Sequence, residues 1–121
     1  MDQSTINENI ANQWLAAFNA HNIVSLLELY DETACHFSPK LKLQHPETQG
    51  LITGKPALQQ WWQEAFKRLP MLKYTLTSLT ANDKRVFMQY IRSVPSEDDM
   101  EVAEVLEIKD GKIIFSKVYH G

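Results

Sequence analysis

Hydrophobic residues near the start of the chain recur with the period of an α-helix. Ile10, Trp14 and Phe18 are spaced four positions apart, which places them on one face of an amphipathic helix. We expect this helix to run from about residue 5 to 20 and residues 1–4 to be disordered. A second, short helix follows, because Asn22 is a favourable N-cap and the next apolar residues share one stripe: Ile23, Leu26, Leu27 and Tyr30.

The next segments mix short strands with a polar stretch. Residues 33–37 are apolar or β-branched and predict a strand that ends at Ser38-Pro39, since proline cannot donate to a sheet ladder. Ala34, His36 and Ser38 fall on one face of it, which we expect to point inward. Residues 40–49 are polar and predict an exposed loop or a lid, and residues 51–53 predict a short strand.

A third helix is predicted after Gly54, with Pro56 near its first turn. Its apolar stripe consists of Leu58, Trp61, Trp62, Ala65, Phe66 and Leu69, and Pro70 follows. Trp61 and Trp62 are adjacent, so they point about 100° apart. We therefore expect only one of the two indoles to face the interior.

Alternating apolar and polar residues predict four further strands, over residues 72–80, 85–94, 102–109 and 112–120. Asp110-Gly111 predicts a two-residue hairpin between the last two strands, in which Ile108 faces Ile113 and Glu104 faces Lys117. In this register one face is mostly apolar, with Val102, Leu106, Ile108, Ile113, Phe115 and Tyr119. The other face carries Val105, Ile114 and Val118 among polar residues. A slip of one residue would exchange the two faces.

These elements predict one α+β domain over residues 1–121: a curved, mixed or antiparallel sheet covered on one side by three helices, forming a cone with a pocket at its open end. The chain has 44% apolar and 22% charged residues, which is typical of a globular domain. Its net charge of −3 argues against a nucleic-acid or anionic-membrane surface. With one cysteine, a polar start and no long apolar run, we expect a cytoplasmic protein.

Several segments resemble the nuclear-transport-factor-2-like (NTF2-like) superfamily, and most closely its SnoaL-like and ketosteroid-isomerase-like branch. The resemblance is carried by WLAAFNAHN, IVSLLELYDETACHFSP, GKPALQQWW and the DGKII hairpin. It implies the same cone-shaped fold, a buried pocket and frequent dimerisation through the outer face of the sheet. The superfamily includes isomerases, cyclases, hydrolases and proteins without known chemistry, so it does not imply one reaction.

The residues that the isomerases use are mostly replaced. Ser38 stands where the resemblance implies an aspartate base, Trp14 where it implies an oxyanion-hole tyrosine, and Glu104 is the nearest match to the second oxyanion donor. A serine hydroxyl is not a base near neutral pH without a partner. Ketosteroid isomerase activity itself is therefore not expected.

Three residues are the candidate catalytic groups: His36, Glu104 and Arg92. If the turn after residue 94 is centred on residue 98, Arg92, Glu104 and Lys117 form one row on the apolar face. This row would orient a polar group, or be a cross-strand ion pair at the rim. His36 is either a general base or a hydrogen-bonded core histidine.

The remaining predicted pocket residues are largely aromatic: Trp14, Phe18, Tyr30, Ser38, Trp61, Trp62, Phe66, Met88, Tyr90, Leu106, Phe115, Lys117 and Tyr119. Such walls suit a small hydrophobic molecule. The four histidines have no metal-ligand spacing, so we expect no metal and no cofactor.

Two functions stay open. The protein is an acid–base enzyme of the isomerase, cyclase or hydrolase type acting on a small hydrophobic molecule, or it is a non-catalytic ligand-binding or dimerisation module. In either case we expect a homodimer through the outer sheet face, formed by Phe87, Ile91, Val105, Ile114 and Val118.

Overall fold

The computed structural model describes residues 2–120 and has the predicted α+β architecture. Its elements are α1 (Gln3–Asn19), α2 (Ile23–Glu28), β1 (Tyr30–Phe37), α3 (Pro39–Gln44), the 3-10 turn η1 (Pro46–Thr48), β2 (Leu51–Thr53), α4 (Lys55–Arg68), β3 (Lys73–Ala81), β4 (Arg85–Ser93), β5 (Met100–Lys109) and β6 (Lys112–His120). The six strands form one sheet in the order β2-β1-β6-β5-β4-β3. The pair β1–β6 is parallel and the other pairs are antiparallel.

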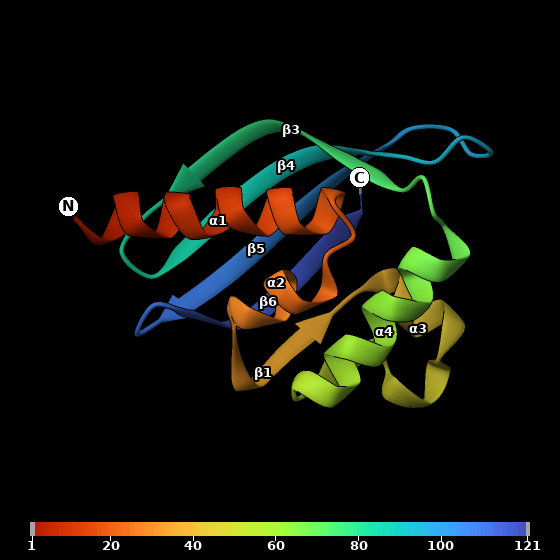
Figure 1. Cartoon of the computed structure of the whole chain (residues 1–121), viewed down its shortest axis with the longest axis horizontal. Helices are drawn as coiled ribbons and strands as arrows, with labels where there is room; N and C mark the ends of the chain where they lie inside the picture. The colour runs from red at the N-terminus through yellow and green to blue at the C-terminus, as the bar shows by residue number, and fades with distance from the viewer. Residues whose placement is uncertain (1, 121) are drawn as a thin grey trace.

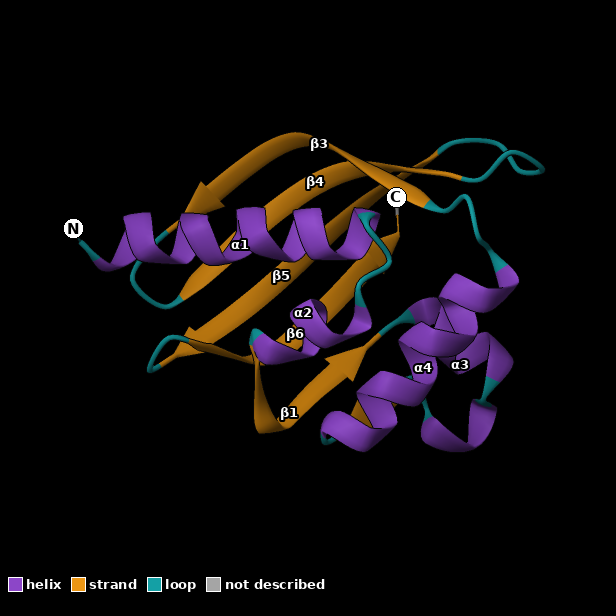
Figure 2. Cartoon of the chain, in the orientation of Figure 1, coloured by secondary structure: helices purple, strands orange, loops and turns teal. Residues whose placement is uncertain are grey.

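The helices α1, α2 and α4 lie against one face of this twisted sheet (Figures 1 and 2). The core between the two layers is apolar, with Leu26, Leu58, Val86, Met88, Leu106 and Ile113 fully buried. Met88 and Leu106 are therefore core residues and do not line a pocket, in contrast to the expectation from the sequence. Burial of this apolar surface is the main force that holds the helices to the sheet.

The first helix starts earlier than expected. The Asp2 side chain accepts a hydrogen bond of 2.9 Å from the Thr5 backbone N–H, so α1 begins at Gln3. The prediction of disorder is thus wrong for residues 2–4, and Met1 lies outside the described residues. The predicted cap of α2 is confirmed, since the Asn22 side chain accepts from the Ser25 N–H.

The polar stretch after β1 is helical rather than an open loop. Ser38 caps α3 by accepting a hydrogen bond from the Lys40 N–H, and Pro39 occupies the first turn, where its missing N–H costs nothing. Leu41 is 1% exposed and anchors this helix to the core. The segment α3–η1 thereby forms an additional layer beside α4 (Figure 1).

This extra layer explains why both adjacent tryptophans are buried. Trp62 lies against Tyr30 and His36 on the sheet side, with ring centroids 5.1 and 5.3 Å away. Trp61 points toward His45 of the α3–η1 segment, 6.1 Å away. The prediction that only one indole would face the interior is therefore wrong, because α4 is covered on two sides.

The final hairpin has the predicted turn, with positive φ at Asp110 and Gly111 as a type I′ turn requires. The pairs Ile108–Ile113 and Lys109–Lys112 are also as predicted, but the register then shifts by one residue and Glu107 lies opposite Phe115. Ile114 is the additional residue of this β-bulge.

The bulge reverses the two faces of β6 beyond it. Phe115, Lys117 and Tyr119 lie on the outer face, so their prediction as pocket residues is wrong. Val118, predicted on the outer face, is 8% exposed and faces inward together with Ser116. Glu104 accordingly lies opposite Val118 and not opposite Lys117.

The register between β4 and β5 also differs from the prediction. Arg92 lies opposite Met100, and Met88 lies opposite Glu104. This register arises because β5 begins at Met100 and the turn between the two strands is centred closer to the end of β4 than expected. The observed register differs from the predicted register by an even number of residues. Met88, Tyr90, Arg92 and Glu104 therefore still share the buried face, but the row Arg92–Glu104–Lys117 does not form.

Candidate functional site

A cavity of about 130 Å³ lies between the helices α1, α3 and α4 and the strands β1 and β3–β6. Its inner wall is mostly aromatic, with Trp14, Phe18, Trp61, Trp62, Tyr74 and Tyr90. His36, Ser38, Arg92 and Glu104 also line it. The structure therefore brings the three candidate catalytic residues to one cavity, although they come from three different strands.

Glu104 is the most deeply buried charged residue of this cavity, at 1% exposure. Its Oε1 atom accepts a hydrogen bond of 2.6 Å from the Tyr90 hydroxyl. Its Oε2 atom is buried and has no hydrogen-bond partner among the described residues. Burial raises the pKa of Glu104 to about 7, and the hydrogen bond from Tyr90 opposes this rise, because desolvation penalises the charged carboxylate.

Two tyrosines support this carboxyl group. The rings of Tyr74 and Tyr90 stack with centroids 4.0 Å apart, and Trp14 lies 6.0 Å from Tyr74. Burial and the nearby Glu104 carboxylate raise the pKa of Tyr90 well above its usual value. The Tyr90 hydroxyl thus stays protonated and is a permanent donor to Glu104.

His36 ends a buried chain of hydrogen bonds. The Trp14 indole donates to the Tyr30 hydroxyl at 3.0 Å, and Tyr30 donates to Ser116 Oγ at 2.9 Å. Ser116 Oγ lies 2.6 Å from His36 Nδ1, and the imidazole tautomer decides which of the two donates. Burial lowers the pKa of His36 to about 4, so the imidazole is neutral near pH 7.

Ser38 and Tyr30 have structural roles beside the cavity. The Ser38 hydroxyl is occupied as the cap of α3, and Tyr30 is buried in the core without lining the cavity. Phe66 stacks on His21, with centroids 4.4 Å apart, and also lies outside the lining. These positions correct the expectation that Tyr30 and Phe66 line the pocket.

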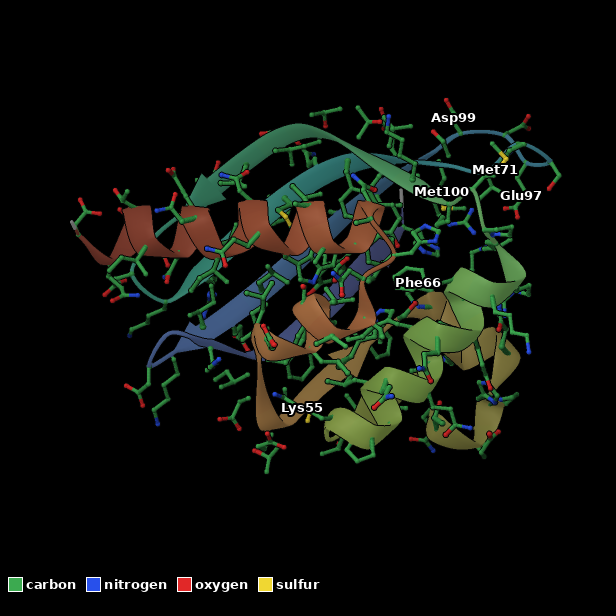
Figure 3. All side chains as sticks on the ribbon, viewed as in Figure 1. Lys55, Phe66, Met71, Glu97, Asp99 and Met100 are labelled. Atoms are coloured by element: carbon green, nitrogen blue, oxygen red, sulfur yellow. The ribbon has the colours of Figure 1, made fainter. Side chains whose placement is uncertain are left out.

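The mouth of the cavity is polar and cationic. Lys40, Arg68, Arg92 and His120 line it together with Gln44 and Glu97. Arg92 Nη1 donates to Glu97 Oε1 at 2.9 Å. Figure 3 shows Glu97 on the loop between β4 and β5, at the end of the molecule where α4 terminates.

Several of these residues were not identified from the sequence. Tyr74 lies on a strand that the alternation predicts, but its stacking on Tyr90 has no signal in the pattern. Ser116 was hidden because the bulge at Ile114 reverses its face. Lys40 lies in the segment for which the sequence predicts a loop, and Arg68 is the last residue of α4, between two members of the apolar stripe.

Within residues 2–120, no group of three or more histidine, cysteine, aspartate or glutamate side chains is arranged to hold a metal ion. The described helices also include none with the length and apolar character needed to cross a membrane.

The sequence also matches a known protein family. A family model described as a SnoaL-like domain matches residues 11–115. The chain belongs to the SnoaL-like family. None of the curated proteins compared with this SnoaL-like chain matches it.

Solved structures have the same fold at low sequence identity. A SnoaL-like protein of unknown function from Burkholderia thailandensis is 20% identical, with a TM-score of 0.87 over 97% of this chain and 95% of that chain. Bal32a, from a soil-derived mobile gene cassette, is 20% identical, with a TM-score of 0.84 over 98% and 92%. A Kribbella flavida protein, assigned provisionally as a ketosteroid isomerase, is 17% identical, with a TM-score of 0.82 over 100% and 82%. These structural similarities show that the chain has the NTF2-like fold. A reaction has to be inferred from the residues of the site.

Proposed function

We propose that this SnoaL-like protein binds a small hydrophobic molecule in the cone and transfers a proton to or from it with Glu104. The observation that carries this proposal is the Oε2 atom of Glu104, which is buried at the cavity and has no partner among the described residues. An unpartnered buried oxygen is costly in a protein that has no use for it. A ligand group that shares a proton with Oε2 would satisfy it.

The state of the carboxyl group supports the same proposal. Because the pKa of Glu104 is raised to about 7, both its protonated and its ionised forms are populated near neutral pH, as a general acid or base requires. Tyr90 holds the other oxygen in place. The neutral His36 would bond to a polar group of the ligand that gains charge in the reaction.

Glu104 would therefore have the role of base that an aspartate at the position of Ser38 has in the isomerases resembled by this chain. Ser38 itself is engaged as a helix cap. Isomerisation, cyclisation and hydrolysis of a small hydrophobic substrate all include such a proton transfer. Ketosteroid isomerisation with the usual base is not part of the proposal.

The test uses 5-nitrobenzisoxazole, a small flat molecule that needs only a base. Glu104 Oε2 would take the proton from its C3 atom, and the C–H electron pair would complete the C≡N bond. The N–O bond would break with its electron pair moving to oxygen, which gives the coloured 2-cyano-4-nitrophenolate. We expect saturable turnover whose kcat/KM rises with pH through an apparent pKa near 7. The Glu104→Gln variant keeps the acceptor for Tyr90 and should lose this turnover.

Lys109→Gln is the matched control and should behave as the parent protein, because Lys109 is exposed at the end of β5 beside the hairpin turn and does not line the cavity. Turnover that Glu104→Gln retains, or a wild-type rate no higher than that of a free carboxylate in water, would contradict the proposal.

The alternative is a ligand-binding module without catalysis. The serine at position 38, where the isomerases resembled by this chain have their aspartate base, favours it. In this case 5-nitrobenzisoxazole would bind with similar affinity to the parent and to Glu104→Gln, without turnover by either.

The proposal includes a homodimer through the outer sheet face. Its support is the exposure of large apolar side chains there, with Phe87 at 41%, Ile114 at 37% and Tyr119 at 47%. Arg85, Glu107 and Lys117 share the same shallow groove, so a second copy could pair opposite charges across it. Sedimentation at micromolar concentration tests this, and a monomer would contradict it. The cytoplasmic location expected from the sequence is also part of the proposal, and cell fractionation tests it.

A further inference from the structure

The mouth of the cavity has the opposite charge to the protein as a whole. The chain has a formal net charge of −3, yet Lys40, Arg68 and Arg92 converge at this mouth with a single carboxylate, Glu97. Because the three cations come from α3, α4 and β4, they are brought together by the fold and not by a local run of basic residues. A cationic rim above an apolar cavity attracts a ligand that has both an anionic group and an apolar body.

Arg92 is the most deeply buried cation of this rim. It projects from the buried face of β4 and is only 7% exposed. A guanidinium has five donor N–H groups, and among the described residues its hydrogen-bonded partner is Glu97. A buried cation of this kind needs an anion beside it, and the site therefore already accommodates one carboxylate.

The carboxylate that fills this position belongs to an exposed connection. Glu97 lies in the loop between β4 and β5, its backbone N–H donates to the Val94 carbonyl at 3.0 Å, and its side chain is 40% exposed. Its pKa is lowered by the hydrogen bond and charge of Arg92 and, more weakly, by Lys40 and Arg68. Displacing Glu97 into solvent would uncover Arg92 without disturbing the core.

The spacing of Arg92 and Glu104 suggests the shape of the ligand. Arg92 pairs with Met100, and Met88 pairs with Glu104, so the two charged groups start from positions four residues apart along neighbouring strands. At about 3.3 Å per residue this is roughly 13 Å along the sheet. Tyr90 and Val102 form the pair between them, and both line the cavity.

We propose that the cavity binds a small hydrophobic carboxylate, whose anionic group replaces Glu97 on Arg92 while its apolar body extends toward Glu104. The inference rests on the proposed function for the orientation of the ligand, but the recognition of the carboxylate by Arg92 is independent of catalysis. Glu97 is then a built-in substitute that occupies the site in the absence of ligand.

The experiment compares 4-phenylbutanoate with its neutral amide, 4-phenylbutanamide, by isothermal titration calorimetry on the full chain. We expect the carboxylate to bind at least about tenfold more tightly, because only the anion can take the place of the Glu97 carboxylate in a charge-assisted hydrogen bond with Arg92. Glu97→Gln removes the competing charge and should tighten binding of the carboxylate while leaving the amide unchanged. Arg92→Gln should abolish the preference, and Lys109→Gln should keep it.

Equal affinities for the two probes, no binding of either, or a Glu97→Gln variant that binds the carboxylate more weakly would overturn the inference. If Arg92→Gln does not fold, the Glu97→Gln result decides by itself, because Glu97 is at the surface. Glu104→Gln should retain the preference for the carboxylate. If Glu104→Gln loses turnover but keeps the preference for the carboxylate, Glu104 acts in the proton transfer and not in recognition of the carboxylate. If the wild type turns over 5-nitrobenzisoxazole but shows no preference for the carboxylate, only the inference about carboxylate recognition is refuted.

Discussion

Replacing Glu104 by glutamine should make the protein more stable at alkaline pH and leave its stability nearly unchanged in acid. Glutamine has the shape of the protonated acid and can still accept the hydrogen bond from Tyr90. It cannot ionise, so the variant removes the cost of a buried negative charge and little else.

The size of the effect follows from the pKa of Glu104. In the unfolded chain this carboxyl group titrates near 4.5, and in the folded protein at about 7. Between these values the folded protein holds a proton that the unfolded chain has released, so the free energy of unfolding falls as pH rises. Each pH unit is worth about 1.4 kcal/mol, and the wild type should therefore lose about 3 kcal/mol between pH 4.5 and 7 through this group.

His36 has the opposite effect on the same protein. Its pKa is lowered from 6.5 to about 4, so the unfolded chain binds a proton that the folded protein does not. Stability consequently rises with pH from about 4 to 6.5, again by about 3 kcal/mol. The two contributions oppose each other in the wild type, which hides both of them over most of this range.

Urea unfolding at several pH values between 4 and 8, followed by tryptophan fluorescence, separates the two groups. The difference in unfolding free energy between Glu104→Gln and the wild type should grow by about 3 kcal/mol from pH 4.5 to 7. His36→Asn, which keeps a partner for Ser116, should show a stability that falls over the same interval. Other titrating groups, such as Glu97 and His120, are common to all three proteins and cancel in the differences. A difference between Glu104→Gln and the wild type that stays constant with pH would refute the assignment of a raised pKa to Glu104.

Two further substitutions test the structure around the site. Gly50→Ala should destabilise the protein by about 1–3 kcal/mol, because Gly50 has a φ of +88° and an added Cβ would lie 2.7 Å from the Phe37 ring; thermal unfolding measures this, and an unchanged Tm would contradict the described turn. Ser116→Ala should cost about 1–3 kcal/mol, because it leaves the buried Tyr30 hydroxyl and His36 Nδ1 without their shared partner; it should also alter the titration of His36 seen by NMR, and an unaltered titration would exclude the hydrogen bond.

The architecture could be predicted from the sequence because its signals are local and repeated. The stripe of Ile10, Trp14 and Phe18 indicates a helix, and Asp110-Gly111 indicates a hairpin, whatever the rest of the chain does. The alternation predicts Glu104 and Arg92 on the inward face, and this holds in the structure, because an even error in register keeps every side chain on its own face.

The details of the site depend on features without such a signal. Ile113, Ile114 and Phe115 are all apolar, so the alternation that would reveal the bulge is absent. The polar residues 40–44 form a helix because Ser38 caps it and Leu41 anchors it, and a loop was the simpler interpretation. The partnership of Arg92 with Glu97 depends on the path of a connecting loop, which periodicity does not describe.

The pairing of β1 with β6 has a consequence for how the protein folds. The strands β3 to β6 follow one another along the chain and can pair through short connections, whereas His36 and Ser116 are separated by 80 positions. Closing so long a segment costs chain entropy before any contact compensates for it, and such pairings are slow to form. We therefore expect the C-terminal meander to assemble first and the N-terminal half to dock onto it afterwards. The cavity that holds both His36 and Glu104 would then exist only after this last step, so that a partly folded chain has neither the pocket nor its chemistry.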